Sequence, residues 1–256
     1  MNILSDRIVN LTESATLRMA ALARELQQKG IDVINLSLGE PDFQTPQHIK
    51  DAAKRGIDEG YTFYTPVSGY LDLRQAIAAK FKRENGLDYT PDQIVVSTGA
   101  KQSIINVVLC MVNPGDEVIL PAPYWVSYAA MVELAEGKVV ELPTGIANNF
   151  KMTAAQLEAA ITPRTKLIIF SSPSNPTGMV YTKDELHDIA QVVAKHPNLF
   201  VISDEIYEHI NYVGKHESIA QFGFVKDRII TVNGLAKGFA MTGWRLGYIG
   251  APTIIA

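Results

Sequence analysis

The stretch Thr231-Val-Asn-Gly-Leu-Ala-Lys237-Gly-Phe-Ala-Met-Thr-Gly-Trp-Arg245-Leu-Gly-Tyr248 decides the expected fold. The apolar run Arg228-Ile-Ile-Thr-Val232 leads into it and predicts a buried strand that ends in a glycine-containing turn. That turn carries Lys237 between apolar neighbours, where desolvation lowers the pKa of an amine, as a Schiff-base lysine requires. Taken alone, a lysine at a strand end is more often an ordinary surface residue. Three upstream motifs reverse that interpretation.

The first motif is Asp204-Glu-Ile-Tyr207, directly after the apolar run Leu199-Phe-Val-Ile202. Open α/β sheets place their ligands at the carboxyl ends of strands. A carboxylate there could keep a pyridinium nitrogen protonated, so that the ring acts as an electron sink. If a helical turn follows, Tyr207 points the same way as Asp204 and could reach an oxygen of that ring. The other interpretation is that Asp204 only caps the turn.

The second motif is Ser171-Ser-Pro-Ser-Asn175-Pro-Thr-Gly178, after the strand-like run Lys166-Leu-Ile-Ile-Phe170. Its two prolines fix φ and remove backbone donors, so the motif predicts a rigid loop. The Asn175 amide is then free to contact a ligand. As turn chemistry alone the motif is ordinary, because Asn-Pro commonly starts turns.

The third motif is Ser97-Thr-Gly99-Ala100-Lys101-Gln-Ser103, between the strand-like Ile94-Val-Val96 and the helix-like stretch 104–111. A strand, a glycine turn and a helix start make an anion site from free backbone N–H groups and the helix dipole. A turn of this kind is more often only a tight connection. It is not a Walker loop, because the Gly-Lys-Ser/Thr ending is absent.

Together and in this order, the four stretches strongly resemble the fold-type I pyridoxal-phosphate-dependent aminotransferases, in particular the bacterial aspartate (aspartate/prephenate) branch of class I. The resemblance extends from about residue 5 to residue 252. Further matching stretches are Leu38-Gly39-Glu40-Pro41-Asp42-Phe43, Tyr61-Thr-Phe-Tyr64-Thr-Pro-Val-Ser-Gly69 and Pro121-Ala-Pro-Tyr124-Trp125-Val-Ser-Tyr128. The resemblance implies the cofactor pyridoxal 5'-phosphate. It also implies transamination between an amino acid, with aspartate favoured, and a 2-oxo acid such as 2-oxoglutarate.

The resemblance also implies a role for each residue of the reaction centre. Lys237 is expected to bond covalently to the cofactor and to move the proton at the substrate Cα. Asp204 is expected to hold the pyridine nitrogen. Asn175 and Tyr207 are expected at the 3′ oxygen of the ring, with Tyr207 counted among the catalytic residues.

The remaining implied roles concern the phosphate, the ring face, the substrate and the subunit contact. Arg245 is expected to clamp the phosphate as a permanent cation, and Tyr64 to reach the phosphate of a neighbouring subunit. The active enzyme is therefore expected to be a homodimer with shared sites. The backbone of Gly99, Ala100 and Lys101 is expected to cradle the phosphate, Trp125 to stack on the ring, and Gly39, Trp125 and Asn175 to meet the substrate.

Two departures from the family pattern stand out. Many members have a serine three residues before the lysine, and here that residue is Gly234. The family also continues into a small C-terminal domain that carries the arginine for the substrate carboxylate, whereas no charged residue follows Arg245 here. The chain is therefore expected to be truncated. Residues 1–45 would belong with the largely absent small domain, and residues 46–256 would form the large cofactor-binding domain.

Apolar runs alternate with helix-like stretches, which predicts an α/β fold with a mainly parallel seven-stranded sheet covered by helices. A helix closed by Gly30 is expected over Ser14–Lys29. An amphipathic helix with Leu73, Ile77 and Phe81 on its apolar face is expected to end at Gly86. The predicted strands are Ile94–Ser97, Glu117–Leu120, Lys138–Leu142, Lys166–Ser171, Leu199–Ser203, Arg228–Val232 and Leu246–Gly250.

Composition excludes several functional classes. With 256 residues, 47% of them hydrophobic, the chain can bury one large core, and a net charge of −4 gives no nucleic-acid footprint. No run approaches the roughly 18–20 apolar residues that span a bilayer, and no signal-peptide core is seen, so a cytoplasmic protein is expected. The five histidines lack metal-ligand spacing and are expected at the surface, with no metal site. Cys110 is expected to be an inert buried thiol.

Three alternatives stay open. The same residues serve lyases and synthases of this fold, which use the same cofactor to eliminate a substituent. A regulatory module built on an aminotransferase domain would carry a winged-helix segment ahead of Leu38, and the sequence there does not resemble one. The third alternative is a folded but inactive fragment of an aminotransferase.

Overall fold

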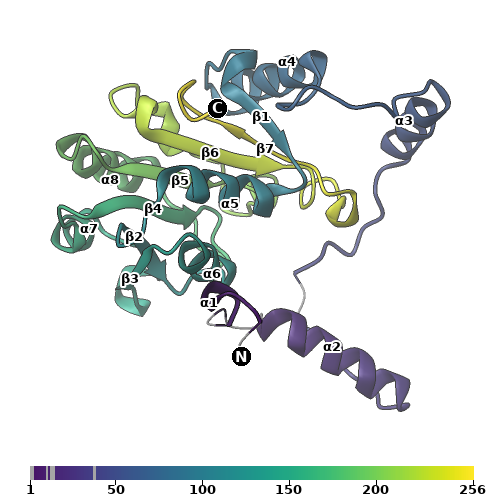
Figure 1. Cartoon of the computed structure of the whole chain (residues 1–256), viewed down its shortest axis with the longest axis horizontal. Helices are drawn as coiled ribbons and strands as arrows, with labels where there is room; N and C mark the ends of the chain where they lie inside the picture. Colours follow the sequence, from purple (N-terminus) through teal and green to yellow (C-terminus); the bar gives the residue numbers. More distant parts are fainter. Residues whose placement is uncertain (1–2, 10, 12–14, 37–38) are drawn as a thin grey trace.

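A seven-stranded sheet with helices on both faces forms the centre of the protein (Figure 1). The computed structural model describes residues 3–9, 11, 15–36 and 39–256. The strand order is β1-β7-β6-β5-β4-β2-β3, and only β7 runs antiparallel to its two neighbours. The predicted mainly parallel α/β fold is therefore confirmed. The strands are β1 Ile94–Ser97, β2 Glu117–Ala122, β3 Lys138–Pro143, β4 Thr165–Ser171, β5 Phe200–Asp204, β6 Ile229–Gly234 and β7 Gly247–Gly250.

The helices end close to where the sequence predicts. Gly86, with φ 68°, closes a π-helical turn, Phe81–Asn85, that extends α4. The helix predicted from Ser14 is α2, although Ser14 itself lies outside the described residues. The α-helices are α1 Asp6–Val9, α2 Ala15–Gln28, α3 Gln47–Asp58, α4 Leu71–Lys80, α5 Ala100–Met111, α6 Ser127–Leu134, α7 Ala154–Ala160 and α8 Lys183–Lys195.

The sheet separates two hydrophobic cores. Successive residues of a strand face opposite sides, so Ile168 joins the core under α4, α7 and α8, whereas Leu167 and Ile169 join the core under α5 and α6. The same alternation holds in β5, where Val201 faces the α4 side and Ile202 faces the α6 side. A side chain at the end of β5 is therefore directed to one core or the other by its position alone.

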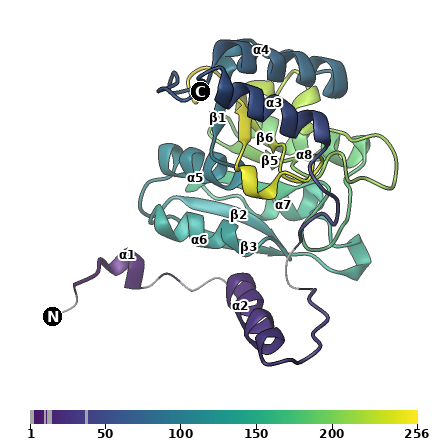
Figure 2. The same cartoon turned by 90° about the vertical axis from the view of Figure 1, so that its right-hand side faces the viewer.

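The N-terminal part of the chain lies apart from the sheet. Figure 1 shows α2 and α3 projecting from the body of the molecule, Figure 2 shows α2 clear of the sheet, and no residue of α3 is buried. Apolar side chains at Leu17, Met19 and Leu22 of α2 are exposed. The assignment of residues 1–45 to a second domain stays a prediction. Among the described residues, no helix is long and apolar enough to cross a membrane.

Two expectations about single residues are wrong. Cys110 is exposed, because the buried face of α5 is formed by Ile104, Val107 and Val108, and Cys110 lies off that stripe. His216 is not a surface residue, because its side chain is only 8% exposed and pairs with the buried Glu205. A pattern of apolar residues cannot reveal a buried ion pair formed through a loop.

Candidate active site

The carboxyl edge of the sheet gathers the predicted residues. Strands β4, β5 and β6 are parallel, so the segments that follow them leave from the same edge. Asp204 ends β5, Asn175 lies in the loop after β4, and Lys237 lies in the turn after β6. Strand β7 lies between β6 and β1, and helix α5 begins after β1 with Gly99 as its N-cap. The topology thus brings all four motifs together.

Asp204 is a buried carboxylate without a charged partner. It is 4% exposed, and it accepts hydrogen bonds from the hydroxyl of Tyr128 (2.7 Å) and the backbone N–H of Ile206 (3.2 Å). Burial raises the pKa of Asp204 to about 6, although these two bonds oppose the shift. No ion pair to Asp204 is formed within the described part of the chain. Such a group is suited to a cationic ligand atom.

Lys237 lies half-buried in the turn after β6. Its Nζ lies 5.5 Å from the ring centroid of Tyr207 and donates to the carbonyl of Gly39. Burial lowers the pKa of the Lys237 amine, the nearby carboxylates of Glu40 and Asp204 oppose the shift, and the Arg245 charge adds to it. A neutral amine is a nucleophile and a base, so this environment favours covalent and proton-transfer chemistry.

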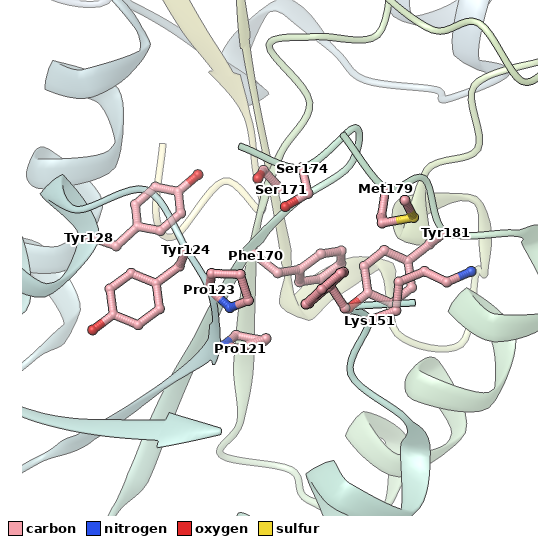
Figure 3. Close-up of a pocket in the computed structure, with 11 residues that line it drawn as sticks. Pro121, Pro123, Tyr124, Tyr128, Lys151, Phe170, Ser171, Ser174, Met179 and Tyr181 are labelled. Carbon is pink, nitrogen blue, oxygen red and sulfur yellow. The ribbon is translucent and has the colours of Figure 1, made fainter. Parts of the chain in front are cut away.

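Asn175 and Tyr207 meet beside Asp204. The Asn175 amide donates to the Tyr207 hydroxyl at 3.4 Å, and the Asn175 backbone N–H donates to Oγ of Ser171 at 3.2 Å. Ser171 and Tyr128 also line a small pocket next to the site (Figure 3). Two polar side chains from different loops are therefore held together, as a shared hydrogen-bonded ligand atom requires.

The turn at Gly99 is in contact with Arg245. Gly99 has φ 89°, and a Cβ there would lie 2.4 Å from Nη2 of Arg245, so only glycine permits this approach. The Arg245 guanidinium is anchored by donating to the carbonyl of Thr242 at 2.8 Å. The N–H of Gly99 already donates to Ser97 O (2.7 Å), which leaves Ala100 and the residue after it as the backbone donors of the expected cradle.

Positive charge accumulates around this turn. Lys101 lies with Nζ 4.9 Å from the ring centroid of Trp125, which itself packs edge-on against Tyr128 with ring centroids 5.5 Å apart. Burial and the Arg245 charge lower the pKa of Lys101. Arg245 acts on Lys237 in the same way. Arg245 thus lies in electrostatic reach of both lysines, and this positive charge favours an anionic ligand near the positive end of the α5 dipole.

Two predicted site residues stand differently from the rest. Tyr64 is fully exposed, and its expected contact with another subunit stays a prediction. Gly39 is adjacent to the site through its bond from Lys237, whereas Leu38 beside it lies outside the described residues. The departure at Gly234 has a steric reason: a Cβ there would lie 2.7 Å from the carbonyl oxygen of Leu246.

The role of Tyr128 escapes sequence reasoning. This residue is 1% exposed, and its hydroxyl is the side-chain donor to Asp204. Burial and the Asp204 charge raise the pKa of Tyr128 well above its ordinary value, so the hydroxyl keeps its proton. The available signal was its place three residues after Trp125 at a helix start, since a buried tyrosine hydroxyl needs a polar partner.

Comparison with known proteins gives one consistent result. The family model "Aminotransferase class I and II" matches residues 31–256. The chain is 53% identical over 250 residues to a Petunia hybrida protein named bifunctional aspartate aminotransferase and glutamate/aspartate-prephenate aminotransferase, covering 97% of this chain and 52% of the relative. It is 50% identical over 261 residues to a probable aspartate/prephenate aminotransferase of Rhizobium leguminosarum bv. phaseoli, covering 98% of this chain and 64% of the relative.

The solved structures agree. The aspartate aminotransferase from Thermus thermophilus with maleate superposes with a TM-score of 0.96 at 45% identity, covering 100% of this chain and 66% of that one. The chain therefore spans between about half and just under two thirds of the length of these relatives. The family model matches most residues of the chain, and the fold superposes on that of a solved aspartate aminotransferase. The chain therefore belongs to the class I and II aminotransferase family.

Proposed function

We propose that this chain is the cofactor-binding part of a pyridoxal-phosphate-dependent aminotransferase, with aspartate as amino donor and 2-oxoglutarate as the paired oxo acid. One observation carries the proposal. Asp204, a buried carboxylate without an ion-pair partner, lies in electrostatic reach of Lys237, an amine with a lowered pKa, and Arg245 links Lys237 to the helix start at Gly99. Few ligands other than a cationic ring with an aldehyde and a phosphate suit all three.

The residues present fit that cofactor. Asp204 lacks a charged partner and suits a protonated ring nitrogen. The cradle at Gly99 is narrow enough that a methyl group would collide with Arg245, which suits a phosphate held between the guanidinium and the first turn of α5. The Asn175 amide and the Tyr207 hydroxyl, 3.4 Å apart, suit a single ring oxygen.

Each residue then has a defined task. Pyridoxal phosphate, when bound, would supply an electron sink for the negative charge that develops at the substrate Cα. Lys237 would hold the cofactor covalently, and its amine would move the proton at the substrate Cα. Asp204 keeps the ring nitrogen protonated, and Asn175 and Tyr207 fix the ring oxygen.

The phosphate and the ring face have their own partners in this proposal. Arg245 and the N-terminal turn of α5, at Ala100 and Lys101, hold the phosphate. The Gly99 turn allows Arg245 to approach. Trp125 covers the ring and, with Gly39 and Asn175, meets the substrate.

The assembly belongs to the proposal as well. Tyr64 is fully exposed, together with Phe63 and Val67 at 83% and 102% exposure. In a homodimer with shared sites, Tyr64 would complete the phosphate site of the partner subunit. Residues 1–45, with their exposed apolar side chains on α2, would pack with a small C-terminal domain that carries the arginine for the substrate α-carboxylate. A cytoplasmic location likewise stays a prediction.

The preference for aspartate rests on the names of the relatives and on charge. Those names include aspartate, glutamate and prephenate activities. All of these substrates carry a second carboxylate, and Lys101 offers a cation close to Trp125 that could pair with it. The distinction between these acids therefore lies beyond the residues that hold the cofactor.

The test separates cofactor chemistry from turnover. The chain is mixed with pyridoxal phosphate, reduced with borohydride and digested, and the labelled peptide is identified by mass spectrometry. We expect the label on Lys237. In parallel, amino transfer from aspartate to 2-oxoglutarate is assayed in the whole gene product. A label mainly on another lysine would overturn the site assignment, and ammonia release without amino transfer would indicate a lyase.

A further inference from the structure

A second buried carboxylate lies directly behind Asp204. Glu205, the residue after β5, is 0% exposed, and it bonds to Ser203, which alternation in β5 places on the opposite side of the sheet from Asp204. Its Oε1 accepts from the hydroxyls of Ser203 (3.0 Å) and Ser218 (2.6 Å), and its Oε2 pairs with Nε2 of His216 at 2.8 Å. Two hydroxyl donors and an imidazole nitrogen thus converge on one carboxyl group, an arrangement that suits a carboxylate as the acceptor.

His216 is the counter-charge of Glu205. Its side chain is 8% exposed, and its Nδ1 has no protein partner among the described residues, so Glu205 is its one hydrogen-bond partner there. Burial by itself lowers the pKa of His216, but the charge and hydrogen bond of Glu205, with the charge of Glu208, outweigh burial and raise it. The imidazole is thus held toward its cationic form inside the protein.

The other ionisable side chains on the α4 side of the sheet pair with one another. From α4, Lys80 reaches Glu208, which also accepts from Asn85 at 2.8 Å, and Lys80 lies 3.7 Å from Glu84. His209 lies 3.4 Å from Glu208 and 3.6 Å from Glu84. Lys80 slightly opposes the protonation of His216. Tyr89 and Tyr248, from the loop before β1 and from β7, are buried phenols whose pKa values burial raises, so they add no charge.

Glu205 acts on Asp204 through its charge. Burial is the main cause of the raised pKa of Asp204, and the Glu205 carboxylate raises it further, whereas Lys237 lowers it. The two carboxylates are adjacent in the chain and both lie in low-dielectric surroundings, where like charges repel strongly. Without a cation on Glu205, the ionised form of Asp204 would face an uncompensated buried negative charge.

We propose that His216 is a positioning residue for the reaction: as the cation paired with Glu205, it neutralises the charge behind Asp204 and so keeps Asp204 ionised. This inference rests on the proposed function, because the ionised form matters only if Asp204 holds a protonated ring nitrogen. If the His216–Glu205 hydrogen bond only held the loop at His216 in place, its loss would leave the titration of Asp204 unchanged. The two roles are therefore distinguishable.

The experiment titrates Asp204 without cofactor. The chain is labelled with carbon-13 in aspartate carboxyl groups, and the Asp204 signal is identified by its loss in Asp204→Asn. His216→Gln retains an amide donor toward Glu205 but removes the charge. We expect it to move the Asp204 titration midpoint upward by about one pH unit. The same change in a Glu205→Gln background should have no effect, because the charge that His216 neutralises is gone.

A matched control and an independent measurement complete the test. His196 pairs with Glu158 at 3.0 Å on the surface, so His196→Gln removes the same kind of pair and should leave the Asp204 midpoint unchanged. In the unaltered chain, the ring C–H resonances of His216 should report a titration midpoint above the ordinary histidine value. This measurement does not depend on the folding of a variant. An unmoved Asp204 midpoint, an equal shift in the Glu205→Gln background, or a His216 midpoint below the ordinary range overturns the inference. The borohydride label on Lys237 tests the proposed function separately.

Discussion

Asp204 and Glu205 are neighbours in the chain, yet their surroundings differ completely. On the α6 side, Asp204 receives two neutral donors, no ion pair in the described structure, and a pKa raised to about 6 by burial. On the α4 side, Glu205 receives three donors, one of them from the imidazole of His216, and Glu208 beside it pairs with Lys80. The carboxylate on the α6 side thus has no ion-pair partner in the described structure, whereas the carboxylates on the α4 side are paired with side chains of the protein.

That difference teaches where the chain accommodates a ligand. A buried charge without a partner lowers the stability of the fold, so it persists where a bound group supplies the missing charge. We therefore expect the proposed chemistry on the α6 side, whereas the ion pairs on the α4 side hold the segments after β5 in place. His209 contacts groups of both regions. It lies 3.4 Å from Glu208, and its ring packs edge-on against Phe239, two residues after Lys237, with ring centroids 5.5 Å apart.

The largest effect is expected at the amine on the α6 side. Lys237→Ala should abolish both the borohydride-fixed label and amino transfer, because the covalent anchor and the proton carrier are lost together. Lys215→Ala removes an exposed lysine from the loop after Asn211 and serves as control, with both signals retained. A label of normal yield in Lys237→Ala would mean that another amine carries the cofactor.

The next effect tests the lack of an ion-pair partner at Asp204 in the described structure. Asp204→Asn should lower the transamination rate by about two to three powers of ten, roughly 3–4 kcal/mol of transition-state stabilisation. The same variant should stabilise the cofactor-free chain at pH 8. The pKa of Asp204 is raised in the folded state, so ionisation costs stability as pH rises from about 4 through about 6, in total about 3 kcal/mol or less.

Urea unfolding at two pH values checks the second half of that prediction. At pH 3, where Asp204 is protonated in both states, the variant and the unaltered chain should unfold at similar urea concentrations. At pH 8 the variant should unfold at the higher concentration. A variant that is less stable at pH 8 would show that Asp204 is an ordinary cap of the following turn, and the contrast between the two carboxylates would disappear.

The third effect tests the ion pairs on the α4 side. Lys80→Met leaves Glu208, whose side chain is 4% exposed, without its cation, and breaking a buried pair in this way costs about 3 kcal/mol or more. Lys82→Met is the matched control, because Lys82 pairs with Asp88 at 2.7 Å where both side chains are exposed, and solvent-screened pairs of this kind contribute little to stability. Equal losses of unfolding free energy in the two variants would contradict the comparison.

The smallest effect is expected at the anion cradle. Gly99→Ala combines a positive φ with a collision at Arg245, whereas Gly115→Ala has a similar φ of 87° and nothing within 4 Å of the new Cβ. Both variants should lose about 1 kcal/mol of stability from backbone strain. Only Gly99→Ala should also weaken cofactor binding, measured as the dissociation constant for pyridoxal phosphate. Equal dissociation constants in the two variants would contradict the assignment of Arg245 to the phosphate site.

Much of the fold could be predicted because strands and turns leave local signals. Strand β1 has the predicted ends, Ile94 and Ser97, and β5 differs by one residue at each end. These strands are short apolar runs bounded by turn residues, and such patterns depend on neighbours in the chain. The antiparallel direction of β7 was not predicted, because periodicity carries no information about strand direction.

The residues of the site could be named from their motifs, but their relations could not. Asn175 and Lys237 lie in loops and Asp204 ends β5, each about 30 residues from the next along the chain, and only the parallel sheet brings them to one edge. The donor Tyr128 and the exposure of Cys110 depended on which face of α6 or α5 meets the sheet. The five histidines look alike in sequence, yet only His216 forms a buried pair with Glu205.

The sequence by itself determined the α/β class, the strand positions, and the motifs that mark the family and its cofactor chemistry, because these depend on residue types at short spacing. Tertiary structure alone decided that Asp204 lies uncompensated on one face of the sheet and Glu205 compensated on the other. The physical reason is that charge compensation depends on distance and dielectric. Both are set by chain segments far apart in sequence that fold against the two sides of β5.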